Sequence, residues 1–346
     1  MVSSPCLALE IITPEQACGI LSAHGGGSWR QYPAYADCAA RRIRARSHYL
    51  LVSDQGRPLA LANVRVKCLA PLGGIALISH GPVLLRPKEH WRTDLPMVLA
   101  AIRRHICGQK VLVLRVDPDP AWARYDPFIT GHGLTGFTTL TDKKYRTIFI
   151  DTTQDIKALR CGLAGKWRTD LNRAERGNLR ISCSKNPADF TLFSRLLDDL
   201  MRRKGFSIPQ NTDFFAEVSR SARNPEQVLL HAAWEGDEMI SGHIGSFCGD
   251  SAVYLLGATT HRGRELRASH ALHWAVILRA RRMGLPAYDL GGIDEQKNPG
   301  VFRFKSRMGG VRHSGPAMIE ARPHGLSGQI PIMLESVMKH LRQRAA

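Results

Sequence analysis

The sequence lacks most of the short motifs that mark common enzyme classes. It contains no GxxxxGKS or GxxxxGKT phosphate loop, no GxGxxG after an expected strand, no HExxH zinc motif and no GxSxG nucleophile motif. Its eight cysteines include no CxxC pair, which argues against a compact zinc site and against a small disulfide scaffold. Cysteines scattered singly are typical of a reducing compartment, where they serve as small apolar residues.

Long apolar runs and a basic leader are also lacking. The longest uncharged stretch runs from Leu69 to Leu85, and glycines, prolines and a histidine interrupt it, so it does not predict a membrane helix. The N-terminal segment has no basic residue before Glu10, which argues against a signal peptide. A long heptad repeat is absent as well. We therefore expect a cytoplasmic protein without a coiled-coil arm.

Acidic residues are few relative to basic ones. Lys and Arg together number 48 and Asp and Glu 30, which gives a formal net charge of +18. Such an excess favours an anionic partner, namely a nucleic acid, a nucleotide or an anionic membrane surface, without choosing among them. A generally basic proteome is the alternative explanation.

Segments with strand and helix periodicity follow one another in the same order in the two halves of the chain. The first half predicts strands at 49–53, 59–67 and 74–79, a helix at 91–107 and a strand at 111–116. The second half predicts strands at 228–234, 239–247 and 252–258, a helix at 269–283 and a strand at 287–290. This order indicates a duplicated α/β unit with mixed sheets flanked by helices. We expect domains at 1–150 and 151–319, with the tail at 320–346 able to pack back on the first.

A basic helical block lies between the halves. Helices are expected over 156–176 and 188–204. Lys166, Arg168 and Arg173 in the first of these helices are candidates to contact RNA phosphates. The alternative is a solvated helix face with ion pairs to Asp170 or Glu175.

The connection between the strand at 252–258 and the next helix is a candidate phosphate site. At such a turn, a coenzyme A-dependent acyltransferase binds diphosphate through glycine-rich backbone N–H groups. Gly263 is the only glycine of the connection, so this pattern is not met, although Arg262 and Arg264 could hold a phosphate.

Two histidines of the expected helix raise the question of a metal site. His270 and His273 lie three residues apart and would share one helix face. Because no third ligand is evident, we interpret them as packing or surface residues and expect no metal.

The most unusual stretch, residues 288–310, reads YDLGGIDEQKNPGVFRFKSRMGG and mixes glycines, aromatics and basic residues. Its Phe302 and Phe304 alternate with Arg303 and Lys305. An extended strand here would turn both rings toward the core and both cations toward a cleft. Paired cations suit a phosphate, or the oxyanion that forms when an amine attacks an ester. The alternative is an edge strand with solvated charges.

Taken together, these segments resemble the FemABX family, the aminoacyl-tRNA-dependent peptidyltransferases that add amino acids to the peptide of peptidoglycan precursors. The matching pieces occur in the family's order and are HGPV at 80–83, KWRTDLNRA at 166–174, RKGF at 203–206, YLLGA at 254–258, and YDLGGI at 288–293 followed by GVFRFK at 300–305 and GG at 309–310. The last of these is the most specific. His80 stands where the family usually has an arginine, and Met308 where a bulky aromatic residue is usual.

The resemblance implies a fold and a reaction. It implies two GNAT-like α/β domains in one chain, of the short branch that has no coiled-coil arm. It implies aminoacyl-tRNA as the donor, no cofactor, and an amine of a soluble or lipid-linked peptidoglycan precursor as the acceptor. tRNA and the precursor are therefore the expected partners, with peripheral contact to the inner membrane surface as a further candidate.

Catalytic residues follow from motif position. The resemblance implies that Lys305 stabilises charge on the tetrahedral intermediate or on the terminal tRNA phosphate. Asp289 is a second candidate, as the acceptor of a proton from the attacking amine. For Asp289 the alternative is a structural role at the end of its strand.

Substrate-binding residues are assigned in the same way. Arg203 and Tyr254 match family positions that line the precursor site, where Arg203 would pair with a diphosphate. We add Arg303 to this group because the expected strand geometry turns it toward the cleft, and we add Phe304 of the same segment.

Three functions remain open from the sequence. The leading hypothesis is an aminoacyltransferase that uses aminoacyl-tRNA. The second is a GNAT-type N-acyltransferase that uses acyl-CoA and a different amine. The third is a basic two-domain protein without activity that binds RNA or a membrane, with steeply salt-dependent affinity.

Overall fold

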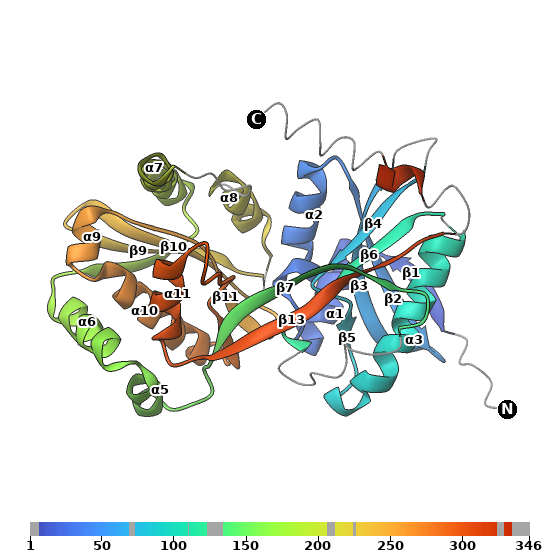
Figure 1. Ribbon diagram of the computed structural model, residues 1–346, viewed down its shortest axis with the longest axis horizontal. Coiled ribbons are helices and arrows are strands. Elements are labelled where there is room, and N and C mark those ends of the chain that lie inside the picture. The colour runs from blue at the N-terminus through green and yellow to red at the C-terminus, as the bar shows by residue number, and fades with distance from the viewer. Residues whose placement is uncertain are drawn as a thin grey trace. The chain divides into compact units, whose positions relative to one another are not determined.

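The computed structural model describes residues 7–68, 73–109, 111–122, 134–205, 212–223, 226–323 and 329–333 (Figure 1). The chain divides into two compact units. Unit 1 comprises Met1–Tyr145 and Ser314–Ala346, and unit 2 comprises Arg146–His313. The boundaries expected from the sequence, after residues 150 and 319, lie a few residues further along the chain. Each unit is an α/β structure with its own hydrophobic core.

Unit 1 holds a mixed sheet with the strand order β1-β2-β3-β4-β6-β13. The β4–β6 pair is parallel, and the other neighbours in this order are antiparallel. The elements are β1 (Ala8–Ile12), α1 (Pro14–His24), α2 (Pro33–Arg42), β2 (Arg46–Asp54), β3 (Arg57–Cys68), β4 (Gly74–Ser79), β5 (Val83–Leu84), α3 (Trp91–Arg103), β6 (Val113–Asp117) and β13 (Val311–Ala321).

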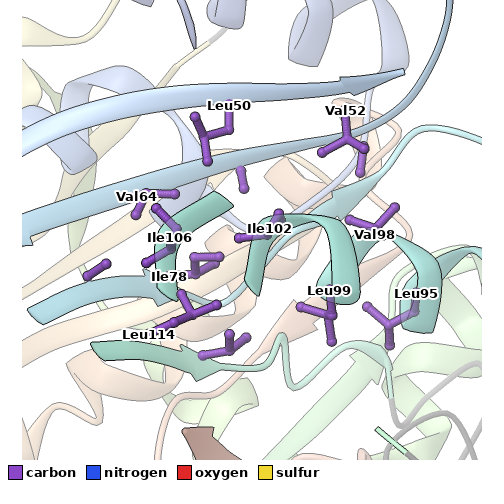
Figure 2. Close-up of a cluster of buried hydrophobic side chains, with 14 of the residues drawn as sticks. Leu50, Val52, Val64, Ile78, Leu95, Val98, Leu99, Ile102, Ile106 and Leu114 are labelled. Atoms are coloured by element: carbon purple, nitrogen blue, oxygen red, sulfur yellow. The ribbon is translucent and has the colours of Figure 1, made fainter. Parts of the chain in front are cut away.

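The core of unit 1 forms between α3 and this sheet. Leu95, Val98, Leu99 and Ile102 recur at intervals of three and four residues along α3, which places them on one helix face. Figure 2 shows these side chains against Leu50, Val52, Val64, Ile78 and Leu114 of β2, β3, β4 and β6. Burial of an aliphatic side chain of this size contributes about 1.5–3 kcal/mol, so this face holds α3 on the sheet.

Unit 2 holds a second mixed sheet segment with the order β7-β12-β11-β10-β9-β8. The β11–β12 pair is parallel, and the other neighbours are antiparallel. The elements are β7 (Thr138–Asp151), α5 (Ile156–Gly162), α6 (Gly165–Arg176), β8 (Arg180–Ser184), α7 (Pro187–Lys204), α8 (Thr212–Ser221), β9 (Val228–Glu235), β10 (Glu238–Cys248), β11 (Ser251–Thr259), α9 (His261–Glu265), α10 (Ala268–Arg282), β12 (Ala287–Asp289) and α11 (Pro299–Ser306).

Helices cover both faces of the unit 2 sheet. In Figure 1, α7 and α8 lie on one side of the strands, and α5, α6 and α10 lie on the other. The core beneath α6 and α10 contains Trp167, Phe247, Trp274 and Tyr288, all buried. In the described ranges of both units, no helix is long and apolar enough to cross a lipid bilayer.

The two units repeat one strand order. The series β1-β2-β3-β4-β6 in unit 1 corresponds to β8-β9-β10-β11-β12 in unit 2, with antiparallel pairs followed by one parallel pair. The predicted α/β duplication is therefore confirmed. The strand that completes each series comes from elsewhere in the chain: β13 pairs with β6, whereas β7, which follows β6 in sequence, pairs with β12.

Some predictions of local structure need correction. The helix expected over 156–176 is two helices, because Leu163 and Ala164 have extended ψ angles of 135° and 143°. The helix expected over 91–107 leaves α-helical geometry at Arg104 and continues as a wider turn to Gln109. The long strands β7 and β13 were not predicted.

Candidate active site

Unit 2 contains a cleft where β11 and β12 part. Their parallel pairing ends at Val253↔Asp289, although β11 continues to Thr259. In unit 1, the corresponding strands β4 and β6 stay paired up to Ser79↔Asp117, the last residues of both strands. In unit 2, β11 thus extends beyond its parallel neighbour, and the residues of this extension line the cleft, whereas in unit 1 β4 ends together with β6.

The cleft has a volume of about 540 Å³ and is bounded by residues of α6, α7, α9, α10, α11, β10 and β11. Five of the predicted catalytic and binding residues line it, namely Lys166, Tyr254, Arg264, Phe304 and Lys305. Gly257 leaves room for the Tyr254 ring, because a Cβ at that position would lie 2.3 Å from the tyrosine hydroxyl. The cleft thus combines aromatic walls with cationic groups, a lining that suits a ligand with both apolar and anionic parts.

The segment that carries Lys305 is a helix and not the extended strand that the alternating pattern predicted. The side chain of Asn298 caps α11, and Pro299 occupies its first position; both are strong helix-start signals. Residues two apart on a helix point about 200° apart, so Arg303 and Lys305 face different ways. Arg303 is exposed and lies outside the cleft lining, whereas Lys305 is 5 % exposed. The predicted pair of cations is therefore corrected to one buried cation from this segment.

Lys305 is held by backbone carbonyls. Its Nζ donates to the carbonyl oxygens of Gly292, at 2.9 Å, and Gly291, at 3.4 Å. The same nitrogen lies 5.0 Å from the centre of the Tyr254 ring, within cation–π range. Burial lowers the pKa of Lys305 to about 8, while the charge of Asp289 opposes this shift. The group is therefore mostly cationic at neutral pH but close to its titration point.

Asp289 lies outside the cleft lining and supports the loop that holds Lys305. Its carboxylate accepts hydrogen bonds from the Thr147 hydroxyl and from the backbone N–H of Gly291, the latter at 2.8 Å. Gly291 has a φ of +72°, and a Cβ there would lie 2.7 Å from the Tyr254 carbonyl oxygen, so the turn requires glycine. The structure thus favours the structural alternative for Asp289 over direct contact with a substrate.

The low pKa of Lys305 can be measured on the protein alone. In a ¹³C NMR titration of labelled lysines, we expect one Cε signal with a midpoint near 8, which the Lys305→Arg variant loses. Since the negative charge of Asp289 favours the cation, Asp289→Asn should move this midpoint to lower pH. An ordinary midpoint near 10.4 for every lysine, or an upward shift in Asp289→Asn, would contradict this environment.

Buried histidines and tyrosines adjoin Lys305. His273 Nδ1 lies 2.9 Å from the Tyr288 hydroxyl, and the same hydroxyl lies 3.4 Å from His243 Nε2. The rings of His243 and His273 lie 4.6 Å and 5.1 Å from that of Tyr254. Burial, together with Lys305 and His270, lowers the pKa of His273 to about 3, and burial lowers the pKa of His243 well below its usual value. Both imidazoles are therefore neutral at neutral pH.

Sequence reasoning missed this cluster. It interpreted His273 as a packing or surface residue and did not single out His243 or Tyr288. The sequence could have indicated that both histidines are buried, because their neighbours in β10 and α10 are mostly apolar residues, which the structure shows to be buried. Their proximity depends on the pairing of strands far apart in the sequence.

Cationic side chains occupy another part of the cleft lining. Arg267 Nε donates to Asp170 at 2.8 Å, Lys166 Nζ lies 3.7 Å from the same carboxylate, and Arg264 is exposed. Arg267 is also the N-cap residue of α10, and its side chain makes no capping hydrogen bond. Because a helix N-terminus carries a partial positive charge, this side of the cleft attracts anionic groups. Arg267 was not among the residues predicted.

The glycine of the β11–α10 connection has a packing role. The N–H of Gly263 donates to the Thr260 hydroxyl at 3.0 Å, so it is not offered to a phosphate. A Cβ at Gly263 would lie 2.3 Å from the Ile240 carbonyl oxygen, so the glycine allows close packing on β10. Arg262 pairs with Glu235, at 2.6 Å, and does not line the cleft.

Three remaining predicted residues lie away from the cleft lining. Arg203 is exposed near the C-terminal end of α7 and lines a separate open cavity of about 590 Å³ together with Arg195 and Arg202. Arg173 is exposed on α6, and Arg168 donates to the Cys161 carbonyl oxygen at 3.3 Å. These positions leave their roles in phosphate binding as predictions.

The acidic residues considered as partners of Arg168 and Arg173 pair with other cations. Asp170 contacts Lys166 and Arg267, as described above. Glu175 forms an ion pair with Arg160 of α5.

Parts of the chain are similar in sequence to known proteins. Residues 165–306, which include most of the cleft, match the acetyltransferase (GNAT) domain family. The chain is similar to the Lipid II:glycine glycyltransferase of Staphylococcus saprophyticus, with 29 % identity over 89 residues, covering 24 % of this chain and 21 % of that protein. It is also 29 % identical over 75 residues to the Staphylococcus aureus protein of the same name, covering 20 % and 18 %. The chain thus matches about a fifth of the length of these curated relatives.

Solved structures resemble the whole chain. The crystal structure of FemX has a TM-score of 0.74 at 14 % identity and covers 91 % of this chain and 97 % of its own. The C-terminal domain of a putative lysylphosphatidylglycerol synthetase from Agrobacterium fabrum has a TM-score of 0.54 at 11 % identity, covering 94 % and 98 %. At these identities the likeness establishes the fold.

The chain has the fold of FemX, with two α/β units of the same strand order, and residues 165–306 of the second unit match the acetyltransferase (GNAT) domain family. The FemABX resemblance indicated by the sequence is confirmed by the FemX fold together with the glycyltransferase relatives.

Proposed function

We propose that the protein transfers an amino acid from aminoacyl-tRNA to an amine of a peptidoglycan precursor and forms an amide. The observation that carries this proposal is the buried cation of Lys305 in the unit 2 cleft, where an acyl group and an anionic carrier could both be held. The similarity to enzymes named Lipid II:glycine glycyltransferase supports the choice of acceptor class.

The choice of donor rests on the connection between β11 and α10. A diphosphate of coenzyme A would need free backbone N–H groups at this turn, yet the N–H of Gly263 is bonded to Thr260 and the glycine packs on β10. Lys166, Arg264 and Arg267 offer side-chain contacts instead, which suit the phosphates of a tRNA 3′ end. The net charge of +18 favours such a polyanionic donor.

In this reaction the cleft would position the two substrates and stabilise the negative charge that develops on the carbonyl oxygen. The amine nitrogen attacks the ester carbonyl carbon, and negative charge develops on the carbonyl oxygen. A fixed cation such as Lys305 in a site of low polarity stabilises that oxyanion far more than water would. Holding amine and ester in contact contributes further, because it converts a bimolecular step into an effectively unimolecular one.

The acceptor has a second candidate contact away from the cleft. Arg203, with Arg195 and Arg202, lines the cavity near the end of α7. We propose that these arginines hold the diphosphate of the precursor, soluble or lipid-linked, because arginine binds phosphate through paired hydrogen bonds. tRNA, the precursor and a membrane surface bearing lipid-linked precursor are the partners of this proposal.

The proposal is tested by supplying donor and acceptor separately. Purified protein is incubated with a mixture of aminoacyl-tRNAs and either the soluble or the lipid-linked precursor, and the amide product is identified by mass spectrometry. We expect a mass increase of one or more amino acid residues that requires charged tRNA. Absence of an amide product with every charged tRNA and with both precursors would refute the proposal.

A GNAT-type acyl-CoA transferase is the second candidate, favoured by the family match over residues 165–306. Ligand binding discriminates the two, because a ligand at a hundred times its Kd stabilises the folded state by about 2.7 kcal/mol. We expect a rise in melting temperature with aminoacyl-tRNA and none with acetyl-CoA. The opposite pattern would favour the acyl-CoA reaction, and binding of any RNA without turnover would favour a binding protein.

A further inference from the structure

The histidines and tyrosines beside the cleft are an unusual group to bury. His243 and His273 are 2 % and 6 % exposed, and Tyr288 is fully buried. His243 Nδ1 has no hydrogen-bond partner within the described part of the chain. Buried polar groups without a partner cost free energy, so an apolar core would be more stable here, and the retained imidazoles call for a functional explanation.

The group is arranged as a directed chain of hydrogen bonds. His273 lines the cleft, and its Nδ1 is 2.9 Å from the Tyr288 hydroxyl. The hydroxyl lies 3.4 Å from His243 Nε2 on the other side. Since Tyr288 occupies Nδ1 of His273, Nε2 is the ring nitrogen that remains for a ligand in the cleft. The hydroxyl can donate to His243 and accept from His273 Nδ1–H, which leaves Nε2 of His273 without a proton.

The Lys305 cation and the His273 ring both lie close to the Tyr254 ring. Lys305 Nζ lies 5.0 Å from the centre of the Tyr254 ring, and the His273 ring lies 5.1 Å from it. The centre of the Phe304 ring lies 5.3 Å from that of His273 and adds an apolar wall on this side of the cleft. Lys305 and His273 therefore border the same part of the cleft, where a carbonyl oxygen near the cation and an amine near the imidazole can be brought together.

We propose that His273 is a catalytic residue that accepts the proton of the attacking amine through Nε2, and that Tyr288, backed by His243, is the positioning residue that fixes its tautomer. This proposal rests on the proposed acyl transfer. The amine lone pair forms the N–C bond, the carbonyl electrons move to the oxygen facing Lys305, and the nitrogen's proton passes to His273. The oxyanion electrons then re-form the C=O bond as the C–O ester bond breaks, and the electron pair of the broken bond leaves on the ribose oxygen, which takes the proton from His273.

The neutrality of His273 suits this role. A base must be unprotonated when the amine binds, and burial ensures this for His273 throughout the physiological pH range. The amine nitrogen becomes more acidic as its bond to carbon forms, and the negative charge that grows on the carbonyl oxygen favours an imidazolium nearby, so His273 accepts the proton as this bond forms and not before. Asp289, the other candidate base, is bonded to Thr147 and Gly291 and does not line the cleft.

Kinetic variants test the proposal. His273→Gln keeps a hydrogen-bonding side chain and should lower kcat by about a hundredfold or more, with a much smaller change in KM. Tyr288→Phe keeps the ring and should lower kcat less, again at nearly constant KM. The control is His261→Ala, an exposed histidine of α9 paired with Glu265, which should behave as wild type. Unchanged kcat in folded His273→Gln, or an equal loss in His261→Ala, overturns the assignment.

A measurement without substrate separates this proposal from the proposed function. ¹⁵N NMR of histidine-labelled protein should show His273 neutral from about pH 5 to 8 and in the Nδ1–H tautomer, the minor form in free imidazole, with loss of this preference in Tyr288→Phe. An Nε2–H tautomer or a protonated ring rules out His273 as the acceptor, whatever the donor proves to be. If neither aminoacyl-tRNA nor acyl-CoA reacts, the proposed function fails, and the tautomer still decides this inference.

Discussion

Replacement of Lys305 by methionine is expected to lower kcat for amide formation by about a hundredfold to a thousandfold, the range observed when one oxyanion-stabilising donor is removed. Methionine retains an unbranched apolar stem of similar length, so the contact with the Tyr254 ring should survive. The loss should appear in kcat rather than in KM, because the cation acts mainly on charge that develops in the transition state.

The matched control for this variant is Arg303→Met. Arg303 lies on the same helix, two residues earlier, and is exposed outside the cleft lining. Steady-state rates for the two variants should therefore differ by at least about a hundredfold. Equal losses of kcat in the two variants would show that positive charge in general, and not the buried position of Lys305, supports the reaction. An unchanged kcat in Lys305→Met would refute the proposed role of Lys305 as oxyanion stabiliser. Because a buried cation is costly to desolvate, Lys305→Met should be at least as stable as wild type.

Trp167→Ala is expected to lower the free energy of unfolding by about 3–5 kcal/mol, as large-to-small core substitutions of this kind do. Trp167 is 2 % exposed on α6 and packs with Leu159, Leu163 and Leu171. Its ring centre also lies 4.8 Å from that of His270 in the cleft wall, so ligand binding should weaken together with stability. Urea unfolding followed by circular dichroism measures the change.

Two further variants separate packing from hydrogen bonding at this position. The Trp167 indole N–H is buried and has no partner in the described part of the chain. Trp167→Phe should therefore cost far less than the alanine variant, because it keeps most of the volume and removes an unsatisfied donor. Thr169→Ala, on the exposed side of α6, should change stability by no more than about 0.5 kcal/mol. A phenylalanine variant as unstable as the alanine variant would contradict this account.

Local patterns predicted much of the fold. The hairpins β2–β3 and β9–β10 and the helices α3 and α10 were expected because apolar residues recur in them at short intervals. The duplication followed from their order. β7 was not predicted because its pairing depends on β12, which lies more than a hundred residues away in sequence, and no local pattern reports such a partner.

The site was only partly accessible from the sequence. The Phe-Arg-Phe-Lys pattern has a period of two and indicated a strand, but the capping residues Asn298 and Pro299 start a helix and outweigh it. Lys305 was singled out by motif position and does line the cleft, but it is placed there by the helix α11 and not by an extended strand. The place of His243 and His273 beside it depends on the pairing of β10 with β11 and on the packing of α10, which a single sequence does not report.

The strands β13 and β7, which complete the strand series of unit 1 and unit 2, determine the order in which a nascent chain can complete its two sheets. Unit 2 is contiguous from Arg146 to His313, and β7 is synthesised before any other strand of that unit. Unit 1 instead leaves β6 without its outer neighbour until translation has passed Ala321, after all of unit 2 has emerged. Synthesis of the protein thus begins with unit 1, but the sheet of unit 1 is completed only after that of unit 2. A fragment truncated before β13 would present an open strand edge, a known route to aggregation, whereas a fragment of residues 146–313 would carry the entire cleft.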